Sequence, residues 1–131
     1  EKGSEIIRMI HTLLGKEGFR RGTDKYFELF DGQAVTTEDF LHAMSIANGN
    51  YDFSQFSNWY HQAGTPVVEI TTSYDSDSKE YSVTFSQSCP ATPGQVEKLP
   101  YHMPMALGLV KKDGNDFKLS LFASKKGRNY E

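Results

Sequence analysis

The chain has 131 residues, of which 37% are hydrophobic and 13% are aromatic, and its formal net charge at pH 7 is −3. This length suits one domain, or one small domain joined to part of another, and the apolar content excludes a disordered chain. Because phosphate binding requires concentrated Lys and Arg, the charge balance excludes nucleic acid as a partner.

Two further features concern the cellular environment. The single cysteine, Cys89, cannot form an internal disulfide, which fits a reducing compartment. The N-terminus is amphipathic and carries charged residues, so it has the pattern of neither a signal peptide nor a membrane span. We therefore expect a cytoplasmic protein without a membrane partner.

The first thirty residues carry apolar side chains at helical spacing. The spacing predicts a helix over 3–14 with a wide apolar stripe, and Gly15 supplies its stop. A second helix is expected over 16–30, with Phe and Tyr on one side. The apolar side chains of the first stripe are Ile6, Ile7, Met9, Ile10, Leu13 and Leu14.

Two more helices are expected before the chain changes character. Thr36 and Asp39 have the spacing of a capping box, which predicts a third helix over 38–47. Asp52 or Ser54 caps a fourth helix that contains Phe56, Trp59 and Tyr60. Gly64 and Pro66 then end the helical part, because Pro cannot continue a helix.

Alternating apolar and polar residues follow. The stretch 67–74 has the pattern of a half-buried strand, 75–78 that of a turn, and 81–85 that of the return strand, so a β-hairpin is expected. After a loop over 88–100 come the remaining predicted elements. These are strands over 103–110 and 117–122, joined by a turn at Asp113-Gly114, and the start of a fifth strand at 128–131.

The expected fold class is therefore α+β. A helical segment of about four helices, residues 1–63, precedes an antiparallel β-sandwich-type module, residues 64–131. The first helix has an apolar stripe with no preceding partner, and the last strand pattern stops at once, so we expect a module truncated at both ends. An exposed stripe and an exposed sheet edge favour self-association, and a dimer or strand-exchanged form is expected at high concentration.

Four histidines are the obvious candidates for metal binding or acid–base chemistry: His11, His42, His61 and His102. None has a second His or Cys two to four residues later, which is how one helix or strand usually supplies two zinc ligands. We expect no metal site from these residues alone, and we interpret His11 as a packed structural residue. His42 and His61 are expected to be half-exposed.

Other chemistry has little support in the sequence. Cys89 could be a nucleophile only if a histidine activated it, and no supporting signature surrounds it. Neither a Gly-x-Ser-x-Gly elbow nor a Gly-rich phosphate loop occurs. The aromatic residues between Tyr51 and Tyr60 can form either a ligand platform or part of a core. Capping explains the acidic residues Glu38, Asp39, Asp75, Asp77 and Asp113.

Several separated strings resemble one known family in the same order. They are Glu1-Lys2-Gly3, the ten residues from Ile6 to Gly15, Trp59-Tyr60, Gln62-Ala63-Gly64-Thr65-Pro66, and Cys89-Pro90-Ala91-Thr92-Pro93-Gly94-Gln95. The chain resembles the aminopeptidase N family, the bacterial zinc-dependent alanyl aminopeptidases of the gluzincin class. The resemblance covers residues 1 to about 110 and implies the end of a thermolysin-like catalytic domain followed by a β-sandwich domain.

The resemblance also implies which residues this chain does not contain. The family binds zinc through His-Glu-x-x-His and a downstream Glu, and it recognises the substrate amine through Gly-x-Met-Glu-Asn. Neither motif occurs in the sequence. The family's oxyanion-binding tyrosine would precede Glu1. No catalytic, cofactor-binding or metal residue is therefore carried over.

We expect a scaffold fragment of a zinc aminopeptidase that is inactive alone. Zinc and peptide substrates would belong to the full-length parent, and the partners of this segment would be the remaining domains of the same polypeptide. The alternative is a free-standing, non-enzymatic protein-interaction module. A small cysteine or histidine hydrolase has no positive support in the sequence.

Overall fold

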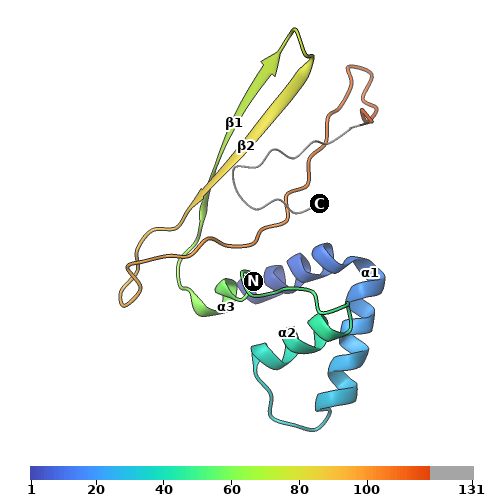
Figure 1. The fold of residues 1–131 in the computed structure, drawn as a ribbon, viewed down its shortest axis with the longest axis vertical. Coiled ribbons are helices and arrows are strands. Elements are labelled where there is room, and N and C mark those ends of the chain that lie inside the picture. Colours follow the sequence, from blue (N-terminus) through green and yellow to red (C-terminus); the bar gives the residue numbers. More distant parts are fainter. Residues whose placement is uncertain (119–131) are drawn as a thin grey trace.

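The computed structural model describes residues 1–118 and has helices followed by an antiparallel sheet, an α+β arrangement (Figure 1). The elements in chain order are α1 Lys2–Phe30, α2 Thr37–Ile46, α3 Asn58–His61, β1 Val67–Asp75 and β2 Glu80–Ser88. Figure 1 shows the helices gathered at one end and the β1–β2 hairpin projecting away from them. Within residues 1–118, none of the helices combines the length and apolar character that crossing a membrane requires.

The first helix differs from the prediction in one respect. The expected stop at Gly15 is a kink, where φ is 68° and ψ is 170°, and the helix resumes directly after it. Gly tolerates this positive φ because it has no Cβ. The two predicted helices are therefore the two runs on either side of this kink, and they share the single label α1. The described residues therefore hold three helices, and the expected count of four is not confirmed.

A core joins α1, α2 and the turn before α3. Its buried residues are Ile6, Ile10, Leu41, Met44, Phe53 and Phe56. Close approach of the helices depends on Gly22, where an added Cβ would lie 2.1 Å from Met44 Sδ. Asn48 also stabilises the contact between α1 and α2, because its Nδ2 donates hydrogen bonds to the carbonyls of Gly18 and Met44. The stripe predicted over 6–14 thus contributes to this core, whereas Phe27, on the predicted aromatic side of the second helix, is 58% exposed.

Of the two helix starts predicted from capping residues, the one at Thr36 is present, whereas the one at Asp52 or Ser54 is not, because α3 begins at Asn58. The Thr36 backbone N–H donates to the Asp39 carboxylate over 2.9 Å, as a capping box requires. The Ser54 N–H donates to Asp52 Oδ1 over 2.8 Å, so Asp52 organises the turn that precedes α3. The fourth predicted helix is short, and only Asn58–His61 is α-helical.

The predicted hairpin is confirmed, with Val67 opposite Ser88 and Asp75 opposite Glu80. The expectation of a half-buried first strand is wrong, because every residue of β1 except Val68 is exposed. In the turn, Asp75 Oδ1 accepts the Asp77 N–H over 2.9 Å. This register places Val68, Ile70, Thr72, Tyr74, Tyr81, Val83, Phe85 and Gln87 on one face. The opposite face carries Ser, Thr, Glu and Asp residues together with Val67, so the hairpin is amphipathic.

The later part of the expected sandwich is not confirmed, because the sheet has two strands within residues 1–118. The predicted strand over 103–110 is reduced to a bridge between Val110 and Asp116, around the predicted turn at Asp113-Gly114. Pro104 removes a backbone donor and Gly108 weakens extended structure, which disfavours a continuous strand. The expectations for 119–131, including the fifth strand, lie outside the described residues.

Candidate functional site

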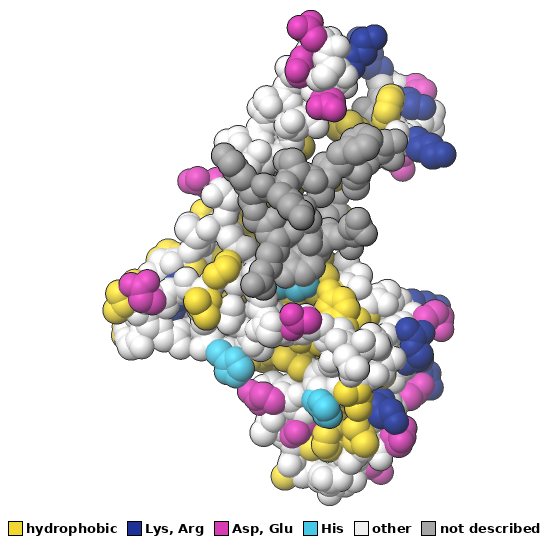
Figure 2. Space-filling model, viewed as in Figure 1, with side chains coloured by type: hydrophobic (Ala, Val, Ile, Leu, Met, Phe, Trp, Pro, Cys, Tyr) yellow, Lys and Arg dark blue, Asp and Glu magenta, His cyan; other side chains and the backbone are white. Residues whose placement is uncertain are grey.

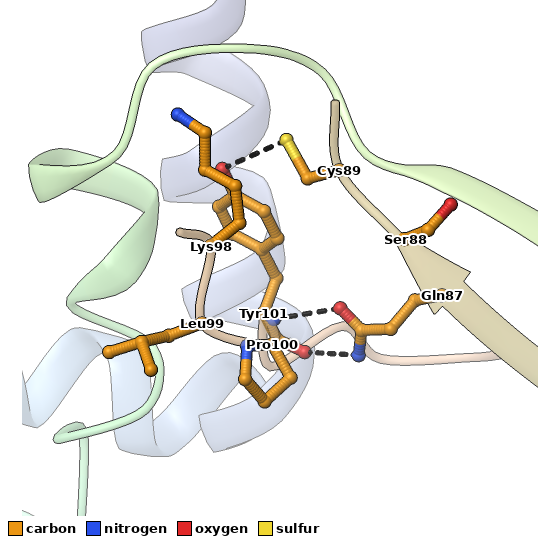
Figure 3. Close-up of a pocket in the computed structure, with 7 residues that line it drawn as sticks. All are labelled: Gln87, Ser88, Cys89, Lys98, Leu99, Pro100 and Tyr101. Atoms are coloured by element: carbon orange, nitrogen blue, oxygen red, sulfur yellow. Dashed lines mark hydrogen bonds between the residues drawn. The ribbon is translucent and has the colours of Figure 1, made fainter. Parts of the chain in front are cut away.

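A small pocket of about 170 Å³ lies between the end of β2 and the segment that returns to α3 (Figure 3). It is lined by Gln87, Ser88, Cys89, Lys98, Leu99, Pro100 and Tyr101. Next to the pocket, the segment 87–102 contacts the segment 58–64 through hydrogen bonds between side chains and backbone groups. We call this contact between the two segments the joint.

Tyr101 lies at the centre of the joint. Its side chain is 1% exposed, and its ring lies 4.4 Å from that of Trp59, centroid to centroid. Gln87 binds both backbone groups of Tyr101, accepting from its N–H over 2.7 Å and donating to its carbonyl over 2.8 Å (Figure 3). Trp59 Nε1 donates to the His102 carbonyl over 2.9 Å. Gln87 of β2 and Trp59 of α3 therefore bind the same dipeptide, Tyr101-His102.

A second glutamine repeats this arrangement on the helical side. Gln62 accepts the Leu99 N–H over 2.6 Å and donates to the Leu99 carbonyl over 2.9 Å. Asn58 Nδ2 donates to the Pro100 carbonyl over 2.9 Å. Because Gln62 binds both groups of one residue, it substitutes for the partner strand that an extended segment would have in a sheet.

Lys98 and Gln95 complete the joint. Lys98 Nζ donates to Ala63 O, Thr92 Oγ1 and Gln95 Oε1 at 3.0, 2.6 and 3.0 Å. Gln95 also accepts the Ala63 N–H over 2.7 Å and donates to the His61 carbonyl over 2.8 Å. These contacts satisfy the backbone groups exposed where the chain leaves α3, which would otherwise need water.

Gly64 and Cys89 meet where the chain turns into β1. Gly64 has φ 96°, and an added Cβ would lie 3.1 Å from Cys89 Sγ, so a side chain here would be strained and crowded. Cys89 Sγ lies 3.7 Å from the Tyr101 hydroxyl, drawn as a dashed line in Figure 3. Burial, and then the contact with Cys89, raise the pKa of Tyr101 above its usual value. The Tyr101 phenol therefore stays protonated at neutral pH and does not take a proton from the thiol.

The four histidines differ in exposure and in the groups that they contact. His61 Nε2 lies 2.9 Å from Glu38 Oε1, and both side chains are more than half exposed. The hydrogen bond from His61 is the main cause that lowers the pKa of Glu38 to about 2. His102 is 2% exposed and packs edge-on against Phe56. Burial lowers the pKa of His102, opposed by the negative charge of Asp52.

The remaining two histidines are on the surface. The interpretation of His11 as a packed, buried residue is wrong: it is exposed, although its ring lies 5.2 Å from that of Phe19. One residue after Ile10, it is turned by about 100° from the buried stripe. His42 is exposed on α2. Within residues 1–118, no three His, Cys, Asp or Glu residues are grouped as a metal site would require.

Sequence reasoning did not predict the joint. Glutamine–backbone pairing has no periodic signature, and Gln62 and Gln87 lie 25 residues apart in the sequence. The sequence signal that could have indicated the joint is the pair of strings 62–66 and 89–95, noted above for their resemblance to one family. In the structure the Ala63 N–H donates to the Gln95 side chain and so joins the two strings.

Comparison with known proteins identifies two matching families. Residues 64–129 match a domain of unknown function, DUF3458, described as having an Ig-like fold. Residues 1–60 match the peptidase family M1 domain.

Individual relatives match across most of the chain. Over 114 residues the chain is 50% identical to aminopeptidase N of Escherichia coli K12 and 47% identical to aminopeptidase N of Haemophilus influenzae. Each of these alignments covers 87% of this chain and 13% of the relative. The chain is also 32% identical over 119 residues to aminopeptidase 2, mitochondrial, of Saccharomyces cerevisiae, of which it covers 12%. It therefore spans about an eighth of the length of these relatives.

Proposed function

Because this chain belongs to the peptidase M1 family of bacterial aminopeptidase N, we propose that it is part of a zinc-dependent enzyme that removes N-terminal amino acids from peptides. Within that enzyme the chain has a structural role, which is to set the position of one domain on another. It fixes the Ig-like part, residues 64–131, to the helical end of the peptidase domain, residues 1–63. The remaining domains of the same polypeptide are its partners, and they bring the zinc and the peptide substrate.

The observation that carries this proposal is the joint. Gln62 and Gln95 each bind backbone groups of the opposite segment as donor and as acceptor, so hydrogen bonds join the two segments in both directions. Gln87 fixes Tyr101 within the segment 87–102. A contact made from paired hydrogen bonds fixes distance and orientation more narrowly than apolar packing alone. This is the property required of a junction that sets one domain against another.

The residues that the structure describes, 1–118, do not fit the zinc that the family implies. The His61–Glu38 contact supplies two ligands and is open to solvent, whereas a catalytic zinc site needs three protein ligands with supporting groups. His102 is enclosed by the core around Phe56. We therefore derive no catalytic step within this chain.

Peptide turnover and zinc content test the proposal directly. The purified 131-residue chain is assayed on an alanyl-anilide substrate, with Escherichia coli aminopeptidase N at equal molarity as the positive control and zinc measured on the same samples. We expect neither turnover nor bound zinc from the chain. Stoichiometric zinc together with turnover that a chelator abolishes would contradict the proposal, and His61→Ala would then test the His61–Glu38 pair as its ligand.

One observation favours the alternative of a free-standing interaction module. The apolar face of the hairpin is largely open, with Ile70 at 59% and Tyr74 at 63% exposed. A reading frame that extends upstream through His-Glu-x-x-His would exclude this alternative, whereas a frame restricted to these residues would favour it.

A further inference from the structure

The pair Asn48-Gly49 follows the end of α2 and is the one Asn-Gly sequence in the chain. Asparagine is a chemically labile residue, and a following glycine increases this lability, because Gly has no side chain to keep its backbone nitrogen away from the Asn Cγ. In this structure the labile amide also joins α1 to α2. The proposed function makes no use of the chemistry of this pair.

Three hydrogen bonds hold the Asn48 side chain. Its Nδ2 donates to the Gly18 carbonyl over 3.0 Å and to the Met44 carbonyl over 2.9 Å, and its Oδ1 accepts from Arg21 Nη2 over 2.9 Å. Both amide protons and the amide oxygen are therefore engaged. Bringing Cγ onto the Gly49 nitrogen requires the carboxamide to rotate, which breaks these bonds. The closed contact between α1 and α2 thus protects the amide.

We propose that Asn48 is a modification site of this chain, which is deamidated when the contact between α1 and α2 opens, and that the product prevents the contact from closing again. In the open state the deprotonated backbone nitrogen of Gly49 attacks Asn48 Cγ and forms a C–N bond. The bond from Cγ to Nδ2 breaks, and the nitrogen takes up a proton and leaves as ammonia. Water then opens the cyclic imide at either carbonyl, which gives aspartate or isoaspartate at position 48. Water is the only co-reactant of this sequence.

The product cannot replace the amide in the helix contact. A carboxylate has no N–H to donate, so the carbonyls of Gly18 and Met44 lose their donor and face a negative charge. Because Gly18 is buried, water replaces this bond poorly. Isoaspartate also lengthens the main chain between the N–H groups of Asn48 and Asn50, which both donate to the Ser45 carbonyl over 3.0 Å. Deamidation therefore disrupts the side-chain contact and the turn together.

Two neighbouring arginines give a matched test of the protection. Both are exposed on α1, whose surface carries Lys and Arg side chains among Asp and Glu (Figure 2). Arg21 donates to Asn48 Oδ1, whereas Arg20 donates to Asp24. The purified 131-residue chain is incubated at mildly alkaline pH, and peptide mapping by mass spectrometry measures the deamidated fraction at residue 48. A synthetic peptide spanning residues 45–53 gives the rate without the fold.

Deamidation in the folded chain should be slower than in the peptide by about ten-fold or more, because local opening must precede the reaction. Arg21→Ala should increase the rate about two- to five-fold, since one of the three hydrogen bonds is lost, and Arg20→Ala should leave it unchanged. Gly22→Ala introduces a methyl group against Met44 Sδ and should also increase the rate. Gly3→Ala, where nothing lies within 4 Å of the added Cβ, is its control.

A second matched pair tests the effect of the product. Asn48→Asp and Asn50→Asp each introduce one carboxylate into the same turn, but of the two residues it is Asn48 whose amide binds the carbonyls of Gly18 and Met44. Asn50 has φ 62°, a conformation that Asp also tolerates. In urea unfolding, Asn48→Asp should raise the equilibrium constant for unfolding about ten-fold or more, and Asn50→Asp less than about two-fold.

Three results would overturn the proposal. They are deamidation of the folded chain at the rate of the peptide, equal rates at residue 48 in Arg21→Ala and Arg20→Ala, and equal stability of Asn48→Asp and Asn50→Asp. None of these measurements depends on peptidase activity, so the modification site and the proposed function fail separately.

Discussion

The helical region and the hairpin have equally regular apolar patterns but bury them to different degrees. In the helical region, α1, α2 and the turn before α3 cover one another, so Ile10, Met44 and Phe56 are inaccessible to solvent. In the hairpin, β1 and β2 pair along their edges and leave the shared apolar face open at Ile70 and Tyr74. A helix stripe can thus be covered by its neighbours in sequence, whereas a sheet face needs a second layer.

The largest difference in the free energy of unfolding should appear when one apolar residue in each region is replaced by alanine. Phe56 is 0% exposed and touches Phe53 and His102, so Phe56→Ala should lower the free energy of unfolding by about 3–5 kcal/mol. Ile70→Ala should cost less than about 1 kcal/mol, because Ile70 is already largely in water. Urea unfolding followed by far-ultraviolet circular dichroism measures both. Similar losses would mean that the hairpin face is covered in solution.

A smaller effect is expected from filling the contact between α1 and α2. In Gly22→Ala the new methyl group meets Met44 Sδ and must displace it, which should cost about 1–3 kcal/mol. Gly3→Ala is the control in the same helix, since nothing lies within 4 Å of its added Cβ and Ala favours helix. A Gly22→Ala protein as stable as Gly3→Ala would show that the two helices do not approach as closely as described.

The hydrogen bonds of the joint should contribute less to the free energy of unfolding than either of these packing contacts. Gln62→Ala removes both bonds to Leu99, but Leu99 is exposed and water replaces much of the loss, so a cost of about 1 kcal/mol is expected. Gln33→Ala removes one local bond to the Leu29 carbonyl and should change stability by less than about 0.5 kcal/mol. The midpoints of urea unfolding compare the two variants, and equal midpoints would contradict a stabilising joint.

The smallest effect expected is a pH dependence from His102. Burial lowers the pKa of His102 in the folded chain. Below about pH 6.5 the imidazole of the unfolded chain is therefore protonated while that of the folded chain stays neutral. Stability should therefore fall as the pH drops from about 6.5 towards the lowered pKa, and Asp52 reduces the effect. His102→Asn should remove this part of the slope between about pH 7.5 and about pH 5.5. An unchanged slope in the variant would assign it to other groups.

Most of the helical region and the hairpin could be predicted because each depends on neighbouring residues. Gly15 marked the kink, Thr36 and Asp39 marked the start of α2, and the alternation from Val67 indicated which residues of β1 share a face. The strand expected over 103–110 failed because an alternating pattern does not supply a partner strand. The joint could not be predicted because its partners, such as Gln62 and Leu99, lie 37 residues apart in the sequence and become neighbours only in the folded chain.

The most direct test of the joint is backbone hydrogen exchange at Leu99 and Tyr101, followed residue by residue by NMR. Each of these N–H groups donates to a glutamine side chain, Leu99 to Gln62 across the joint and Tyr101 to Gln87 within the segment 87–102. We expect both to be protected in the wild type, and Gln62→Ala to remove the protection of Leu99 first. Exchange of both groups at the rate of an unstructured peptide in the folded wild type would contradict the joint, and with it the proposed role of the chain.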